Sequence, residues 1–549
     1  MAAHVETGTM LAPTHYKSQV IKHLGLVAGM VDELGLVERI DQLMPKDEER
    51  RTLSYGQVVK AMIINGLGFN QRALYLSPKF FEDKPVERLL GEGIEADHIN
   101  DDVQGRTLDA IFRYGPEQFY SQLSVQSVVK LGLTCQAGHF DSTSFHTDGD
   151  YNSQLPDDET GGLIRIKKGY SRDHRPDLNQ VVLQLICENQ AGIPLLMKPL
   201  SGNSADKTDF RETVKAHVGQ LRHDVGLRYL VADSALYCRE TLQEMKDILW
   251  ISRAPETITL VKDMVGLTAP TLMANPDEQA MTSLCTTYGE IRQRWLVVYS
   301  PEAYQRSRHT LSKQFRKQSQ TELKAFESLR KQTFACETDA QNALEKLQKR
   351  LKITELLDVE LVQESRHSKP GRPGKEAQPD RHIVRVTGTP ATRLLPYRQK
   401  LERKSCFIVA TNELDQDLLP DTELLQLYKD QQKAERGFRF LKDPQFMAST
   451  LFLKSVKRVM ALTVIMTLCL LVYAALEYRI RKALREANET FPNQLGRPVA
   501  NPTARWVFQF FAGIHILTVG HMQALVLNMN DQQWKLLRLL GKHYEELYS

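Results

Sequence analysis

The sequence lacks the cysteine patterns of a disulfide-stapled or zinc-binding protein. Its seven cysteines are scattered over 549 residues, and none forms a Cys-x-x-Cys pair or lies at ligand spacing from a histidine. A structural zinc site is therefore not expected. The odd number, and the position of several cysteines inside apolar runs, predict reduced thiols in a cytosolic protein.

A strong net charge, internal repeats and a signal sequence are also missing. The formal net charge is +4, which is compatible with nucleic acid but too small to demand it. Met1 to Lys17 holds no basic stretch followed by an apolar one, so no signal peptide is expected. What remains is the composition of an ordinary globular protein, long enough for about two to four domains.

One apolar run stands out from this composition. Val459 to Leu476 carries no charge and is just long enough to span a bilayer. Basic residues flank both ends, among them Arg458 and Arg479, so they give no orientation signal. A membrane span and a fully buried core helix both fit; we favour the core helix and expect no membrane partner.

The pattern of predicted secondary structure changes several times along the chain. We predict a disordered tail, an all-helical N-terminal domain, an α/β core, an insertion of strands and long basic helices, the rest of the core, and a C-terminal helix. Their ranges are 1–17, 18–125, 130–254, 255–405, 406–525 and 526–549. Short helices joined by tight turns suit a helix-turn-helix DNA reader and a dimerisation bundle equally well, and we lean towards DNA binding.

The core reads as strand, hairpin, helix, strand, helix, strand. Gly138 to His146 forms the first strand, and Asn189 to Gly192 is the turn of a β-hairpin. Leu227 to Ala232 is a buried strand, with helices predicted before and after it. This order predicts a mixed α/β sheet of the ribonuclease-H kind.

Three acidic residues far apart in the sequence fall at positions that such a sheet can bring together. Asp141 lies inside one strand, Asp233 follows another, and Glu435 lies on a helix predicted from Asp421 to Asp443. Three converging carboxylates would repel one another without a cation, so they imply divalent metal. Oxygen ligands with open positions suit two Mg²⁺ or Mn²⁺ ions, which can clamp the attacking and leaving oxygens of a phosphodiester. Alone, a strand-end aspartate is usually a turn or capping residue.

The same predicted helix carries further polar side chains. A period of 3.6 residues places Tyr428, Gln431 and Lys442 near one line with Glu435. This face suits a place where a metal ion and a phosphate meet, although a solvated charged helix fits the spacing as well.

Four ordered matches give the sequence a family resemblance. They are Phe140-Asp-Ser-Thr-Ser, Gly169-Tyr-Ser-Arg-Asp-His-Arg-Pro-Asp177, Val231-Ala-Asp-Ser-Ala-Leu-Tyr237, and a Tyr-x2-Arg-x3-Glu-x6-Lys pattern over Tyr428 to Lys442. With these motifs the chain resembles the DDE transposases of bacterial insertion sequences, in the branch with a Tyr/Arg/Glu/Lys helix signature. The resemblance covers about residues 130–520.

The resemblance implies metal-dependent cleavage at transposon ends and strand transfer into target DNA, in a cytoplasmic, nucleoid-associated protein. It implies Mg²⁺ or Mn²⁺ as cofactor with no small-molecule cofactor, double-stranded DNA as partner, and a homodimer in the synaptic complex. The implied catalytic and metal-binding residues are Asp141, Asp233 and Glu435. The implied DNA-binding or phosphate-binding residues are Tyr428, Gln431, Lys442, Arg436, Arg439, Arg175, Lys168 and Trp295.

Several of these roles have competing interpretations. Gln431 stands where the signature has arginine, and a glutamine brings no charge to a phosphate. For Arg175 and Lys168 an ordinary surface charge is the favoured interpretation, and for Trp295 a place in a strand core is favoured over base stacking. A basic stretch within Tyr304 to Leu351 reads as a solvated helical hairpin, with a DNA-backbone contact as the alternative.

Three other functions remain open from the sequence alone. The chain can be a transposase-derived DNA-binding protein with weakened or no catalysis, a non-mobile nuclease with the same core, or a membrane protein that uses the apolar run. The intact set of three carboxylates favours an active transposase.

Overall fold

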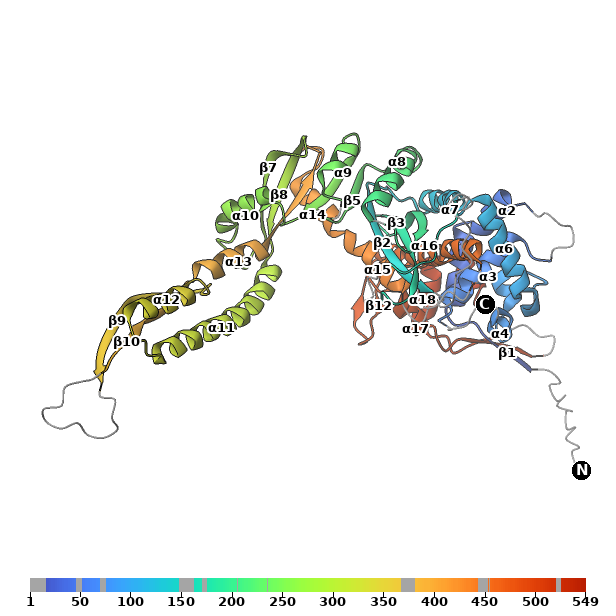
Figure 1. Ribbon diagram of the computed structural model, residues 1–549. Coiled ribbons are helices and arrows are strands. Elements are labelled where there is room, and N and C mark those ends of the chain that lie inside the picture. The colour runs from blue at the N-terminus through green and yellow to red at the C-terminus, as the bar shows by residue number, and fades with distance from the viewer. Residues whose placement is uncertain are drawn as a thin grey trace, which may run out of the picture. The chain divides into compact units, whose positions relative to one another are not determined.

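The computed structural model divides the chain into two compact units (Figure 1). The first contains residues 1–252, 289–291 and 422–549, and the second contains 253–288 and 292–421. The structure describes residues 16–45, 52–69, 76–147, 162–169, 175–204, 206–234, 236–366, 381–442, 453, 455–519 and 525–549.

The first unit opens with short helices, as the sequence predicts. After strand β1 they are α1 to α7 with one 3-10 turn between α5 and α6: β1 Tyr16–Val20, α1 Leu24–Glu33, α2 Leu36–Leu43, α3 Tyr55–Leu67, α4 Ser77–Phe81, α5 Val86–Leu90, η2 Ala96–His98, α6 Asp101–Tyr114 and α7 Pro116–Leu131. Capping fixes several starts; the Ser54 hydroxyl accepts from the Gln57 amide in a capping box before α3. Strand β1 contains Tyr16 and Lys17, the last two residues of the predicted tail.

Five neighbouring strands of a mixed sheet follow these helices. Its elements are β2 Ala137–Thr147, β3 Asn179–Glu188, β4 Pro194–Ser201, α8 Asp206–Val225, β5 Tyr229–Ala232, α9 Arg239–Glu244 and β6 Leu249–Ala254. The strand order is β4-β3-β2-β5-β6, in which β2, β3 and β4 are antiparallel neighbours and β2, β5 and β6 run parallel. An antiparallel meander continued by parallel strands through helical crossovers is the predicted ribonuclease-H-like arrangement.

The predicted β-hairpin is present, and a buried acid closes its turn. The Glu188 carboxylate accepts the backbone amides of Gln190, Ala191 and Ile193 at 2.6, 2.6 and 3.0 Å. Desolvation raises the pKa of this buried carboxyl, and the amide bonds oppose that shift.

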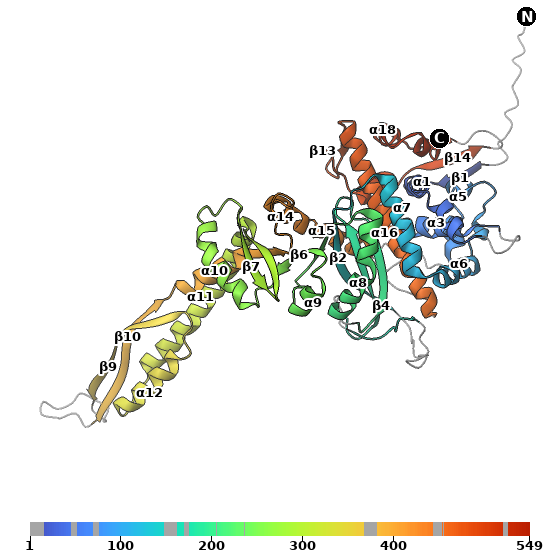
Figure 2. The same cartoon turned by 90° about the horizontal axis from the view of Figure 1, so that it is seen from above.

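The long apolar run is the central helix of the first unit. Helix α16 spans Val456–Glu486 and packs against α1, α3, α6, α7, α15, α17, α18 and β4; Figure 2 shows it beside α7. It is the one helix among the described residues that is long and apolar enough to cross a membrane, and 94% of its most apolar 18-residue stretch is buried in the protein. Packing against the other elements of the first unit therefore explains why this helix is so apolar.

The charges that flank α16 have partners within the same unit. Arg458 donates to both carboxylate oxygens of Asp109 at 2.9 and 2.7 Å, and this bond lowers the pKa of Asp109. Arg479 donates to Glu33 at 2.9 Å and to the carbonyl of Leu540 at 3.0 Å. These arginines join α16 to α6, α1 and α18.

The C-terminal part completes the first unit. Its elements are α14 Asp421–Lys429, α15 Gln431–Leu441, β12 Phe491–Pro492, β13 Pro498–Val499, α17 Ala504–Phe510, β14 His515–Val519, β15 Leu525–Leu527, α18 Asp531–Leu540 and α19 Lys542–Glu546. Strand β14 pairs with β1, so the two ends of the chain share one small sheet. The Tyr548 hydroxyl donates to the Lys22 carbonyl at 2.6 Å, and its ring fills the space that a side chain at Gly25 would need.

The second unit contains three neighbouring strands of a sheet and a two-stranded hairpin, together with helices. Its elements are α10 Thr259–Leu272, β7 Ala280–Tyr288, β8 Ile291–Tyr299, α11 Pro301–Lys331, α12 Glu337–Gln348, β9 Thr354–Arg366, β10 Arg381–Thr392, α13 Leu395–Ser405 and β11 Cys406–Thr411. Strands β11, β8 and β7 are neighbours in that order, and β9 pairs with β10.

The seven cysteines of the chain form no disulfide.

A buried histidine links the first helix to the C-terminal region. His23 is 3% exposed, its Nε2 lies 2.8 Å from the Leu67 carbonyl, and its ring stacks on Phe508 at 4.3 Å. Because a carbonyl only accepts, Nε2 carries the proton in the neutral ring. Burial lowers the pKa of His23 to about 4.

We predict that this histidine makes the protein sensitive to mild acid. Between pH about 6.5 and 4, His23 is protonated in the unfolded chain but stays neutral in the folded chain. The free energy of unfolding therefore falls as the pH falls, by up to about 3 kcal/mol. His23→Gln keeps a donor for Leu67 and removes the titration. Thermal melting over this pH range should show a smaller loss of Tm in His23→Gln than in the wild type; equal losses would show that His23 does not cause the sensitivity.

Candidate active site

One of the predicted carboxylates, Asp141, lies on β2, and another, Asp233, directly follows the parallel neighbour β5. Ala137 of β2 pairs with Tyr229 of β5, and the next two residues keep the same offset of 92 (229 − 137). Asp141 and Asp233 differ by the same 92 (233 − 141), so this register carried two residues further sets them opposite each other. Paired residues of adjacent strands lie about 5 Å apart and point to the same side of a sheet.

The backbone around both aspartates is fixed while their side chains reach solvent. The hydroxyl of Ser252, a fully buried residue of β6, donates to the Asp233 carbonyl at 2.9 Å. The Ser142 amide donates to Asp141 Oδ1 at 2.7 Å. Asp141 is half-buried within the mostly buried strand β2. Asp233 is exposed and follows the carboxyl end of β5, a position where sheets commonly bind ligands.

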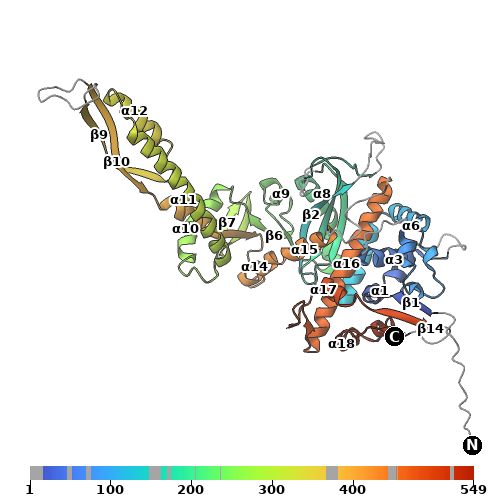
Figure 3. The same ribbon diagram turned by 90° about the horizontal axis from the view of Figure 1, so that it is seen from below.

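The helix that carries Glu435 packs against the strand that carries Asp141. Helix α15 contacts both β2 and α16, and Figure 3 shows it beside them. A side chain at Gly437 would meet Leu470 at 3.2 Å, and the Phe440 ring lies 4.0 Å from Tyr473, so α15 approaches α16 closely. The side chains of Glu435 and Arg436 lie outside the described part of the structure. The backbone of α15 lies next to β2, the strand that contains Asp141.

The prediction of one continuous helix from Asp421 to Lys442 is wrong. Helix α14 ends at Lys429 and α15 begins at Gln431, with Asp430 between them. The Asp430 carboxylate accepts from the Gln426 side-chain amide at 2.9 Å, an i,i+4 pair at the end of α14. Tyr428 is therefore on a different helix from Glu435, and the predicted line of side chains extends only from Gln431 onward.

The phosphate-binding candidates around this helix are accessible to different degrees. Arg439 is exposed, whereas Tyr428, Gln431 and Lys442 are half-buried.

The glycine-containing loop before β3 is held close to the sheet. A side chain at Gly169 would lie 1.9 Å from the Gly202 carbonyl, so only glycine fits there. Residues 170–174 of the motif lie outside the described residues. Arg175 is exposed and donates to both oxygens of Asp177 at 2.9 Å, which lowers the pKa of Asp177 to about 2, and Lys168 is exposed.

Trp295 does not offer a ring for base stacking. It is fully buried on β8, pairs with Ala410 of β11, and donates from its indole nitrogen to Gln293 Oε1 at 3.0 Å. The stacking hypothesis is therefore wrong for this conformation, and Trp295 is a core residue of the second unit.

A metal ion fits the chemistry of the paired aspartates. Their carboxylate oxygens are hard ligands of the kind that Mg²⁺ and Mn²⁺ prefer. Among the described residues no group of three or more His, Cys, Asp or Glu side chains forms a ready metal site; that set does not contain the Glu435 side chain.

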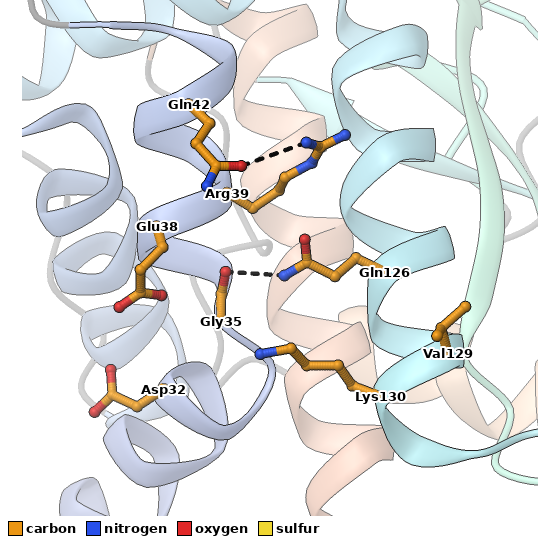
Figure 4. Close-up of a pocket in the computed structure, with 8 residues that line it drawn as sticks. All are labelled: Asp32, Gly35, Glu38, Arg39, Gln42, Gln126, Val129 and Lys130. Carbon is orange, nitrogen blue, oxygen red and sulfur yellow. Dashed lines mark hydrogen bonds between the residues drawn. The ribbon is translucent and has the colours of Figure 1, made fainter.

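A separate polar pocket lies on the N-terminal helices (Figure 4). It has a volume of about 650 Å³ and lies between α2 and α7, with Arg39, Gln126 and Lys130 among its lining residues. The Gln126 amide donates to the Gly35 carbonyl at 3.0 Å. Acidic side chains, including Asp32 and Glu38, also line it, so its charge is mixed.

Comparison with known families decides the class of this protein. The family described as "Transposase DDE domain" matches residues 136–472, more than half of the chain. The chain belongs to the DDE transposase family. The helical region of this transposase, residues 16–125, matches a domain of unknown function, DUF4277.

Other comparisons add no functional detail to the transposase assignment. No curated protein matches the chain. A solved structure, "Cryo-EM structure of piggyBac transposase synaptic complex with hairpin DNA (SNHP)", is similar over 92% of this chain and 82% of that chain, with 9% identity and a TM-score of 0.33. DDE transposase domains generally use divalent metal ions, in agreement with the donor set of this transposase.

Two residues at the site of this transposase escaped the sequence predictions. Ser252 anchors Asp233 from the next strand, and nothing local in the sequence indicates this contact. Gly437 interrupts a helical pattern, and a glycine inside a helix is a recognisable signal of close packing. Ser252 holds the backbone at Asp233, and Gly437 lets α15 pack closely on α16.

We predict that Gly437→Val destabilises the first unit, because the new side chain collides with Leu470. Overpacking of this kind costs about 1–3 kcal/mol. Gly219→Val on the exposed face of α8 is the matched control, since a side chain there meets nothing within 4 Å. Thermal unfolding should show a lower Tm for Gly437→Val alone; equal Tm values for the two variants would contradict close packing of α15 on α16.

Proposed function

We propose that this protein is a cut-and-paste transposase that cleaves DNA at the ends of its element and joins those ends to target DNA. The observation that carries the proposal is the constant offset of 92 residues between paired residues of β2 and β5, which is also the separation of Asp141 and Asp233. The packing of α15 on β2 supports a role for Glu435 at the same site.

The proposed reaction has two steps at phosphorus. In the first, a water oxygen bonds to the phosphorus at the element end and the 3′ oxygen leaves with a proton. In the second, this 3′-hydroxyl attacks a target phosphodiester, loses its proton, and displaces the target's own 3′ oxygen. Both steps exchange one P–O bond for another, so catalysis requires positioning of the strand and stabilisation of charge.

The residues divide this work by their charge. Asp141, Asp233 and Glu435 would hold two Mg²⁺ or Mn²⁺ ions, which when bound supply Lewis-acid activation of the attacking oxygen and stabilise the leaving one. Lys442, Arg439 and Arg436 supply cations for phosphates next to the scissile bond. Tyr428 and Gln431 can donate hydrogen bonds to phosphate oxygens, and Arg175 and Lys168 contribute charge from the loop before β3.

The proposal extends to partners and to the branch of the family. Residues 18–125 would bind the inverted-repeat ends, and two copies would join in a synaptic complex. The Phe140, Tyr237 and Tyr428 motifs support membership in the Tyr/Arg/Glu/Lys branch of bacterial insertion sequences. A nucleoid-associated cytoplasmic protein fits this function.

We predict that Asp141→Asn, Asp233→Asn and Glu435→Gln each abolish cleavage of end DNA and leave its binding intact. Each replacement keeps the side-chain volume and removes a metal-binding charge. The assay is cleavage of an element-end duplex with Mn²⁺ or Mg²⁺, alongside a gel-shift measurement with Ca²⁺. Full cleavage by any one of the three variants would remove that residue from the proposed site, and Glu423→Gln on α14 serves as a carboxylate control.

Gln431 favours a second candidate, a transposase-derived protein that occupies element ends with little or no cleavage. The position lacks the cation that the helix signature contains, and it is the first residue of α15. We predict that Gln431→Arg raises the cleavage rate by roughly tenfold through one charge-assisted phosphate contact. End binding without cleavage by both the wild type and Gln431→Arg would support the remnant, and cleavage without any strand-transfer product would support a non-mobile nuclease.

A further inference from the structure

Helix α11 of the second unit carries a straight row of cations. Arg306, Lys313, Lys317, Lys324 and Lys331 are separated by 7, 4, 7 and 7 residues, and all five are exposed. At 100° per residue they fall within about 20° of a single line along the helix. We call these five residues the basic row.

The opposite face of α11 packs against other elements of the second unit. Leu311, Phe326 and Leu329 are buried there, and Phe326 and Leu329 join a core with Val384 and Val386 of β10. Figure 1 shows α11 alongside α12 and the β9–β10 hairpin. The side of α11 that carries the basic row therefore faces away from its own unit.

A polar contact and an aromatic contact fix this orientation of the helix. The Glu322 carboxylate accepts the backbone amides of Lys352 and Thr354 at 2.9 and 2.8 Å and the side-chain amide of Gln318 at 2.7 Å. Nearer the start of the helix, the Phe315 ring lies 5.2 Å from Tyr397 of α13. Helix α11 is consequently held against rotation about its axis at two places.

The charge of this surface has one sign over most of its length. Between Ala303 and Phe326 the only acidic residue is Glu322, which is buried on the opposite face. The row is about 37 Å long, which corresponds to about one turn of B-form DNA. Single lysine and arginine charges along a rigid rod suit a phosphate backbone, which carries one negative charge per about 1.7 Å of duplex axis.

A membrane surface is a poorer partner for this helix. Interfacial helices insert an apolar face between lipids, whereas the apolar face of α11 is buried against β10 and α13. The row offers charge without an insertable apolar surface.

We propose that the basic row is a sequence-independent binding surface for the phosphate backbone of duplex DNA, separate from the carboxylate site. The inference depends on the proposed function only for the identity of the partner. It assigns the second unit a role in holding DNA that flanks the reacting strand, and it leaves cleavage chemistry to the first unit.

The test compares two variants with the same change in charge. The row variant is Arg306→Gln, Lys313→Gln, Lys317→Gln and Lys324→Gln, and the control is Lys346→Gln, Lys349→Gln, Arg350→Gln and Lys352→Gln. The control positions are exposed and lie on or just after α12. Fluorescence anisotropy with a random-sequence duplex a few turns long measures affinity across a range of salt concentrations.

The row variant should lose affinity for the duplex by roughly a hundredfold or more at about 0.1 M salt. The slope of log affinity against log salt concentration should decrease in magnitude by about 3 to 4. The control should bind as the wild type does. A charge-preserving variant, Arg306→Lys with Lys313→Arg, Lys317→Arg and Lys324→Arg, should also retain wild-type affinity. Circular dichroism melting confirms that each variant is folded.

Two results would overturn the proposal. One is equal affinity and salt slope for the row variant and the control. The other is loss of binding to phosphatidylglycerol vesicles in the row variant while duplex binding is unchanged. Cleavage of a short end duplex in Mn²⁺ separates this proposal from the catalytic one: the row variant should still cleave it, whereas failure of the wild type to cleave would count against the catalytic site alone.

Discussion

The parallel pairing of β2 with β5 is the constraint on which the site depends. Hydrogen bonds between the strands fix the register, and a register shift of one residue would turn a side chain to the other face of the sheet. The pairs from Ala137 to His139 have an offset of 92 residues, and the same offset separates Asp141 from Asp233, two residues further along each segment. Two carboxylates that lie close together repel each other without a cation, so the site that we propose would need a bound metal ion.

The rest of the first unit holds this pair of strands and brings a third element to it. Helix α16 runs through the centre of the unit and contacts β4, α15 and the N-terminal helices. Gly437 and Phe440 seat α15 on α16, and α15 in turn meets β2. An apolar run of membrane-spanning length thus functions as the support of the glutamate helix, and the arginines at its ends are joined to Asp109 and Glu33.

Local patterns in the sequence predicted much of this arrangement. The β-hairpin was predictable because its turn residues lie between two apolar strands, and the strand positions of Asp141 and Asp233 followed from short buried runs beside them. The motifs also predicted the transposase family. Each of these signals lies within about ten residues of the feature that it predicts.

Features that depend on distant contacts were not predictable in the same way. The interruption between α14 and α15 falls at Asp430, where no proline or glycine marks it in the sequence. The pairing of β1 with β14 joins residues about 500 positions apart, and no local periodicity encodes it. The burial of Trp295, by contrast, was the favoured interpretation from the sequence, and the structure confirms it.

The central claim is that Asp141 and Asp233 share one metal site. The most direct measurement is a double-mutant cycle on the affinity for Mn²⁺, with Asp141→Asn, Asp233→Asn and the double variant. Electron paramagnetic resonance measures Mn²⁺ binding while end DNA is bound. If the two carboxylates hold the same ion, the double variant should lose little more affinity than either single variant, with a coupling free energy of about 1–3 kcal/mol. Losses that simply add would contradict a shared site.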